Sequence, residues 1–102
     1  MVDSPDVAVY TGEFANSNTH QGAFAADGTW QTRPDGWLIA KMGLGTYTIT
    51  HNLNTISYGV NLAVPSGTTQ IPIMDANTIE IQCYDGNGNP ADSEVAFSVS
   101  VY

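Results

Sequence analysis

Basic residues are nearly absent from this chain of 102 residues. Only Lys41 and Arg33 stand against ten Asp and Glu residues, so the formal net charge is −8. Proteins that bind DNA or RNA neutralise backbone phosphates with Lys and Arg, and two cations are too few for that. We therefore expect no nucleic-acid partner. Because only 12% of the residues are charged, the surface must consist mainly of Thr, Ser, Asn, Gln and Gly.

Cysteine and long apolar runs are also scarce. Cys83 is the single cysteine, which excludes an intrachain disulfide and a zinc site built from several cysteines. It alternates with Ile79 and Ile81, so we expect a small core residue rather than a nucleophile or a redox centre. No apolar stretch reaches the length of a membrane span, and residues 1–5 lack the features of a secretory signal peptide. We expect a chain made in the cytosol, with no membrane insertion.

Alternation of apolar and polar residues is the strongest structural signal in the chain. Residues 95–102 alternate most clearly and place on one face Val95, Phe97, Val99 and Val101. Residues 78–84 alternate in the same way. Between the two runs lies Asp85–Pro90, a segment of Asp, Gly, Asn and Pro that suits a reversal of the chain. We therefore predict that these two runs pair as a β-hairpin.

Further strand patterns extend over most of the chain. They cover residues 7–11, 37–42, 46–52 and 56–64, with 71–74 as an edge segment because it contains Pro72. The pattern of 56–64 places on one face the alternate residues Ile56, Tyr58, Val60, Leu62 and Val64. Residues 16–22 read as a polar loop. No helix pattern is present. We predict an all-β fold, a single small antiparallel β-sandwich of about six or seven strands, Ig-like or jelly-roll-like, over residues 7–102. Residues 1–6 would be a flexible or partner-bound segment.

The sequence offers few groups for catalysis or metal binding. Asp85–Asn89 resembles the start of a calcium loop, but its sixth position is Pro90 and its twelfth is Ala96, so the EF-hand rule fails and a plain turn is preferred. His20 and His51 are far apart in sequence, and we expect His51 to bond to a turn carbonyl. Hydrolase, protease and phosphate-binding motifs are absent. We expect no enzymatic activity, no metal and no cofactor.

Aromatic residues are the best candidates for a ligand site or an interface. Trp30 and Trp37 bracket the turn Arg33–Gly36, so the two indoles would meet across a hairpin. Aromatic faces beside Asn, Asp and Gln can stack on sugar rings, but aromatics in a small β domain more often belong to the core or to a subunit interface. Tyr84 and Tyr102 fall on the polar faces of their strands and are the better interface candidates.

Two segments carry a resemblance to a family of proteins. Residues 45–54 (Gly-Thr-Tyr-Thr-Ile-Thr-His-Asn-Leu-Asn) and residues 85–99, with 26–30 and 36–43 upstream, resemble small β domains of bacteriophage virion proteins. Such domains form the C-terminal ends of tail and head fibres and related capsid-attached decoration proteins. The resemblance covers about residues 23–102.

The resemblance implies a structural part of a virion without catalytic activity, made in the host cytoplasm. It also implies a homotrimer that contacts other virion proteins, such as the capsid shell or a fibre shaft. Nothing precedes the domain as a shaft, so we expect either a fibre tip or a decoration protein. The alternative is a carbohydrate- or receptor-binding module for host surface glycans, which would expose Trp30 or Trp37 in its loops.

Overall fold

The computed structural model describes residues 18–102 and contains eight strands. The strand predicted at residues 7–11 and the segment 1–6 lie outside the described residues. Among those that are described, no helix is long and apolar enough to cross a membrane. The strands are β1 (Thr19–Phe24), β2 (Trp30–Thr32), β3 (Leu38–Gly43), β4 (Thr46–Thr50), β5 (Tyr58–Ala63), β6 (Thr68–Met74), β7 (Thr78–Tyr84) and β8 (Val95–Val101).

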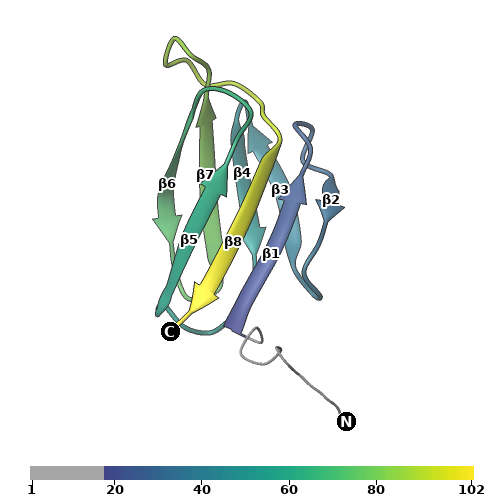
Figure 1. Ribbon diagram of the computed structural model, residues 1–102, viewed down its shortest axis with the longest axis vertical. Helices are drawn as coiled ribbons and strands as arrows, with labels where there is room; N and C mark the ends of the chain where they lie inside the picture. The colour runs from purple at the N-terminus through teal and green to yellow at the C-terminus, as the bar shows by residue number, and fades with distance from the viewer. Residues whose placement is uncertain (1–17) are drawn as a thin grey trace.

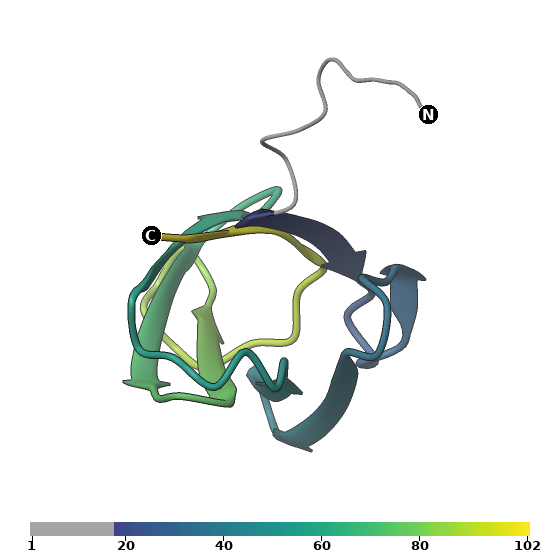
Figure 2. The ribbon, with the colours of Figure 1, turned by 90° about the horizontal axis from the view of Figure 1, so that it is seen from below.

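The strands form two antiparallel four-stranded sheets that face each other (Figures 1 and 2). One sheet has the order β2-β1-β8-β5, and the other has the order β3-β4-β7-β6. Viewed along the strands, β5 and β6 lie together on one flank of the sandwich, and β2 and β3 lie on the opposite flank (Figure 2). The predicted all-β sandwich is confirmed, with eight strands in the described part of the chain in place of six or seven.

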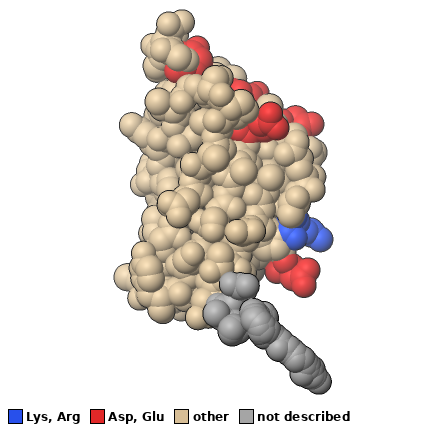
Figure 3. Space-filling model, in the orientation of Figure 1, with Lys and Arg blue, Asp and Glu red and all other residues tan. Residues whose placement is uncertain are grey.

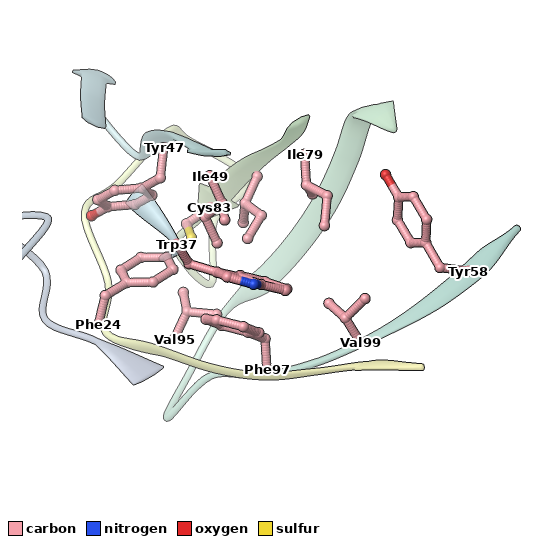
Figure 4. Close-up of a cluster of buried hydrophobic side chains, with 11 residues drawn as sticks. Phe24, Trp37, Tyr47, Ile49, Tyr58, Ile79, Cys83, Val95, Phe97 and Val99 are labelled. Carbon is pink, nitrogen blue, oxygen red and sulfur yellow. The ribbon is translucent and has the colours of Figure 1, made fainter. Parts of the chain in front are cut away.

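The core lies between the two sheets because the inner strands alternate as predicted. In β7 every second side chain is buried, β8 buries Val95, Phe97 and Val99, and β4 buries Tyr47 and Ile49 in the same way. Cys83 is fully buried, which confirms its assignment to the core. The buried apolar residues, most of them visible in Figure 4, are Phe24, Trp37, Tyr47, Ile49, Tyr58, Ile79, Ile81, Cys83, Val95, Phe97 and Val99.

The last two strands do not form the hairpin that the sequence predicts. β7 pairs with β4 and β6, whereas β8 pairs with β1 and β5 in the other sheet. Residues 85–94 therefore carry the chain across the sandwich, with one isolated bridge between Tyr84 and Pro90. Alternation reveals which face of a strand is buried, but it does not reveal which strand lies beside it. β8 lies instead beside β1, the first strand of the described residues.

The N-terminal loop prediction is also wrong, because residues 19–24 form β1 in the middle of a sheet. Gly22 hides the strand pattern. A Cβ atom at this position would lie 2.5 Å from the Phe97 ring and 2.9 Å from the Thr32 carbonyl oxygen. The strand therefore needs glycine where an apolar residue would complete the alternation, since the ring of Phe97 occupies the space of that side chain.

Of the two strands predicted over residues 56–64 and 71–74, the first begins later than predicted and the second lies at a sheet edge as predicted. Ile56 is 72% exposed, so the predicted strand 56–64 is wrong at its start, and β5 begins only at Tyr58. Residues 71–74 do belong to an edge strand, β6, whose pairing with β7 is interrupted by a register shift between Gln70 and Ile73. Pro72 lies within that interruption, where its missing N–H costs no ladder bond.

The loop that crosses between the sheets is held by Asp92. Its carboxylate accepts a hydrogen bond from the Gly45 N–H at 2.7 Å. The same carboxylate forms an ion pair with the Lys41 ammonium group at 3.0 Å. Both contacts hold the pKa of Asp92 below its usual range, and the hydrogen bond from the Gly45 amide has the larger effect. Gly45 packs so closely beneath this loop that an added Cβ would lie 2.7 Å from the Cys83 carbonyl oxygen and 2.8 Å from that of Ala91.

We expect Gly45→Ala to lower the free energy of unfolding by about 3 kcal/mol. Gly45 has a φ of +69°, and its Cβ would press on two backbone oxygens that cannot move independently of the strands. Urea unfolding followed by tryptophan fluorescence measures the change. Gly43→Ala is the matched control in the same hairpin, because no atom lies within 4 Å of its added Cβ. Equal stability of the two variants would contradict this account.

Candidate functional site

Trp37 lies inside the sandwich and is not available to a ligand. Only 2% of its surface is exposed, and its indole stacks on the Phe97 ring with the ring centres 5.6 Å apart and the planes 9° from parallel (Figure 4). Trp37 immediately precedes β3 in one sheet, whereas Phe97 belongs to β8 in the other. The contact therefore joins the two sheets, and Trp37 lacks the exposure that the carbohydrate-binding alternative requires of it.

Trp30 contacts the same phenylalanine from another direction. Its ring centre lies 6.1 Å from that of Phe97 at an interplanar angle of 58°, and it is half-buried against the core. Trp30 begins β2, so Arg33–Gly36 leads from one sheet to the other rather than closing a hairpin. The prediction that Trp30 and Trp37 are cross-strand neighbours is therefore wrong. The two indoles share Phe97 as a common neighbour.

The two tyrosines differ in exposure. Tyr102 is 85% exposed beyond the end of β8, and its backbone N–H donates to the Ser57 carbonyl at 2.8 Å. Tyr84 is half-buried on the outer face of β7, and its hydroxyl lies 3.3 Å from the Gln70 side-chain oxygen. The predicted sites are thus spread over the molecule: the two tryptophans lie in or against the core, and the two tyrosines lie on different sheets. They do not form one site.

His20 and His51, distant in sequence, both pack against Trp37. Their ring centres lie 5.3 Å and 5.6 Å from that of the indole. His51 is 4% exposed and is the only polar residue classed as buried within 18–102. It reaches the Asp75 carbonyl of the β6–β7 turn through the Tyr58 hydroxyl, and its Nδ1 accepts a hydrogen bond from the Leu53 N–H at 3.1 Å.

This acceptor role fixes the protonation of the buried imidazole. A backbone N–H can only donate, so Nδ1 carries no proton and Nε2 carries one. Nε2 lies 3.2 Å from the Tyr58 hydroxyl, which in turn donates to the Asp75 carbonyl oxygen at 2.6 Å. Burial lowers the pKa of His51 and raises that of Tyr58. The chain of bonds satisfies buried polar groups and ties the end of β4 to β5 and to the β6–β7 turn.

The Asp85–Asn89 loop uses its carboxylate to hold the turn. Asp85 Oδ1 accepts hydrogen bonds from the Asn87 N–H at 2.8 Å and the Asn89 N–H at 3.0 Å, so the side chain closes a local turn. Within residues 18–102, no group of three or more His, Cys, Asp or Glu side chains is placed to hold a metal ion. Burial also raises the pKa of the Cys83 thiol, which keeps it protonated.

A shallow, open groove lies on the outer face of the sheet β2-β1-β8-β5. It has a volume of about 460 Å³, and we call it the outer-face groove. A second hollow of about 250 Å³ adjoins it, since both include Ala23, Ala63 and Ala96. The residues that line the outer-face groove are Gln21, Gly22, Ala23, Thr32, Asn61, Leu62, Ala63, Ala96, Phe97 and Ser98.

The outer-face groove carries no charged side chain. It is floored by alanines of three adjacent strands and edged by the amides of Gln21 and Asn61 and the hydroxyl of Ser98. The whole middle of this face is free of charge, and acidic residues lie toward its margins (Figure 3). Such a face can pack against another uncharged protein surface and form hydrogen bonds at its edges, but it holds no group suited to acid–base catalysis.

Sequence reasoning did not find this groove because its floor is made of the outward residues of β1, β5 and β8. Ala23, Ala63 and Ala96 carry no recognisable motif, and they meet only because β8 lies between β1 and β5. The one available signal is the small size of the residues between the buried ones of β8, which are Ala96, Ser98 and Ser100.

We expect Tyr58→Phe to destabilise the protein by about 1–3 kcal/mol. The substitution keeps the ring but leaves the His51 Nε2–H and the Asp75 carbonyl without their shared partner. Thermal and urea unfolding at pH 7 measure the loss. Tyr102→Phe is the control, because that residue is 85% exposed. A Tyr58→Phe variant as stable as the wild type would mean that the hydroxyl contributes nothing to stability.

His51 makes stability depend on pH in a defined direction. Its pKa is lowered from 6.5 in the folded protein, mainly by burial, so the unfolded chain binds the proton more tightly. The free energy of unfolding should therefore be constant above about pH 6.5 and fall as the pH decreases toward 5. Urea unfolding between pH 8 and pH 5 measures this dependence. His51→Gln should flatten the curve over that interval, and an unchanged slope would exclude His51 as its source.

Three comparisons with known proteins give no relative for this chain. No family model matches it, and neither a curated protein nor a solved structure does. Any role assigned to the protein therefore rests on its sequence and on the geometry described above.

Proposed function

We propose that this protein is a structural component of a bacteriophage virion, a capsid decoration, head-fibre or tail-appendage protein that works by assembly and not by catalysis. The observation that carries the assembly role is the outer-face groove, a shallow surface lined without a single charged residue on a protein with a net charge of −8. The virion setting comes from the resemblance of residues 45–54 and 85–99 to small virion β domains.

The distribution of aromatic and polar residues supports an assembly role. Trp37 is buried and Trp30 packs against Phe97 at the edge of the core, and within residues 18–102 no three His, Cys, Asp or Glu side chains are placed to hold a metal ion. Uncharged surfaces pack against partners at low desolvation cost, because no charge has to be stripped of water. We propose that the outer-face groove packs against another protein of the particle.

The carbohydrate-binding alternative loses its main argument in this arrangement. It required exposed indoles, and Trp37 is buried while Trp30 packs against Phe97. Gln21, Asn61 and Ser98 at the rim of the outer-face groove could still bond sugar hydroxyls, and Tyr102, which is 85% exposed, lies at the end of the same sheet. A glycan array therefore serves as the test of the alternative.

The test of the proposal is a pair of arginine variants. We expect Ala96→Arg, which fills the centre of the outer-face groove, to reduce incorporation into purified particles at least about tenfold. Ala40→Arg is the matched control, since Ala40 is equally an exposed strand alanine but lies on β3 of the opposite sheet. Mass spectrometry of gradient-purified particles quantifies the chain, and circular dichroism checks that both variants fold.

Each outcome decides a separate part of the proposal. Absence of the wild-type chain from particles would refute the virion setting. Normal incorporation of Ala96→Arg would refute the role of the outer-face groove, even if the chain is present. Binding of a glycan that Ala96→Arg abolishes would favour the carbohydrate module instead.

A further inference from the structure

The four edge strands of the sandwich differ in how they are protected from pairing with another chain. β2 has only three residues, β3 is broken by a register shift next to Lys41, and β6 contains Pro72 and a second register shift. Short strands, bulges, lysines and prolines are the usual means by which natural proteins block edge-to-edge association. Three of the four edges thus carry such a feature.

β5 carries none of these features. It pairs with β8 over six residues without a register shift, and residues 57–64 contain neither proline nor any charged side chain. Its partner on the other side is missing within residues 18–102, because β5 ends the order β2-β1-β8-β5. An uninterrupted, uncharged edge of this kind is a template for a further strand.

The backbone groups that point to the open edge can be identified. Tyr102 donates its N–H to the Ser57 carbonyl, so Ser57 is hydrogen-bonded to the β8 side. Bonded and non-bonded residues alternate along an antiparallel pair. Gly59, Asn61 and Ala63 therefore bond to β8 as well, while the N–H and C=O groups of Val60 and Leu62 point away from it.

The side chains of these two residues also remain incompletely covered. Val60 and Leu62 face inward with Tyr58 but are only half-buried, because nothing in the described chain continues the sheet beyond β5. β6 lies on the same flank (Figure 2), and its residues Ile73 and Met74 are 47% and 42% exposed. The flank thus combines unpaired strand backbone with apolar surface.

We propose that this flank is a homodimer interface in which β5 pairs with β5 of a second copy, antiparallel and about a two-fold axis at Val60. Val60 then lies opposite Val60 of the second copy, and each Val60 N–H donates to the carbonyl of the other. Each Leu62 N–H donates to the Tyr58 carbonyl of the second copy. The two sheets β2-β1-β8-β5 join into one sheet of eight strands.

Self-pairing fits the properties of this flank better than a charged partner does. An antiparallel pairing of one strand with itself is isologous, so the same edge serves both copies and the assembly closes. Outward on this strand, Gly59 faces Asn61 of the second copy, and neither is charged. Because each chain carries a net charge of −8, the copies repel at long range, and salt should strengthen the dimer by screening that repulsion. The proposal does not depend on the virion setting.

Val60→Pro is the variant that tests the pairing. It removes an N–H that points to the open edge and leaves the bonds from β5 to β8 in place. One bond is lost from each copy, so the dissociation constant of the dimer should rise about 30-fold. Val60→Thr is the control that keeps both the N–H and the branched side chain. Light scattering over a concentration series measures the mass, with 10.8 kDa for one chain.

Hydrogen exchange of the wild-type protein tests the same pairing without a variant that might misfold. The Val60 and Leu62 amides should become protected as the concentration rises, whereas the Gly59 and Asn61 amides, bonded to β8, should be protected at every concentration. A mass of two chains with this pattern supports the proposal. It is overturned by a trimer, by a dimer that Val60→Pro leaves unchanged, or by a monomer in which Val60 and Leu62 are already protected.

Discussion

The packing of the Phe97 ring against the two tryptophans is the interaction on which the rest of the sandwich depends. It projects from β8 toward the opposite sheet, stacks on Trp37 and meets Trp30 at its side. Its position also dictates the composition of the neighbouring strand, because only glycine fits at residue 22 beneath it. Three strands and the segment before β3 are thus organised by one side chain. Stacked and tilted aromatic pairs of this kind contribute about 0.5–1.5 kcal/mol each beyond the burial of their area.

Placing the aromatic residues inside leaves an outer surface made of small and uncharged groups. A small domain has little apolar volume to spare, so the large rings of Trp37 and Phe97 are used where they exclude the most water. The alanines and serines left on the outer face of β8 form a shallow, uncharged floor. The same distribution that stabilises the fold therefore withdraws the Trp37 indole from ligands and leaves a small, uncharged outer surface on β8.

The sequence predicted the class of fold and most of the core but not the topology. Alternation in residues 78–84 and 95–102 identified the buried faces correctly, since burial depends on the spacing of side chains within one strand. The neighbour of each strand depends on contacts far apart in the chain, and so β7 and β8 were wrongly paired. β1 was missed because Gly22 interrupts its alternation, and the reason for that glycine, the Phe97 ring, lies 75 positions away.

The two candidate surfaces, the outer-face groove and the open edge of β5, also depend on strand neighbours that the sequence does not reveal. The outer-face groove could not be predicted, because Ala23 and Ala96 become neighbours only through the pairing of β1 with β8. The open edge of β5 could be recognised in part, since residues 57–64 visibly lack charge and proline. What the sequence could not reveal is that β5 ends its sheet, which turns an ordinary uncharged strand into an exposed one. The net charge of −8 then explains why such an edge is tolerable: repulsion between copies opposes indiscriminate association, and only a pairing that closes on itself leaves no further edge of this kind exposed.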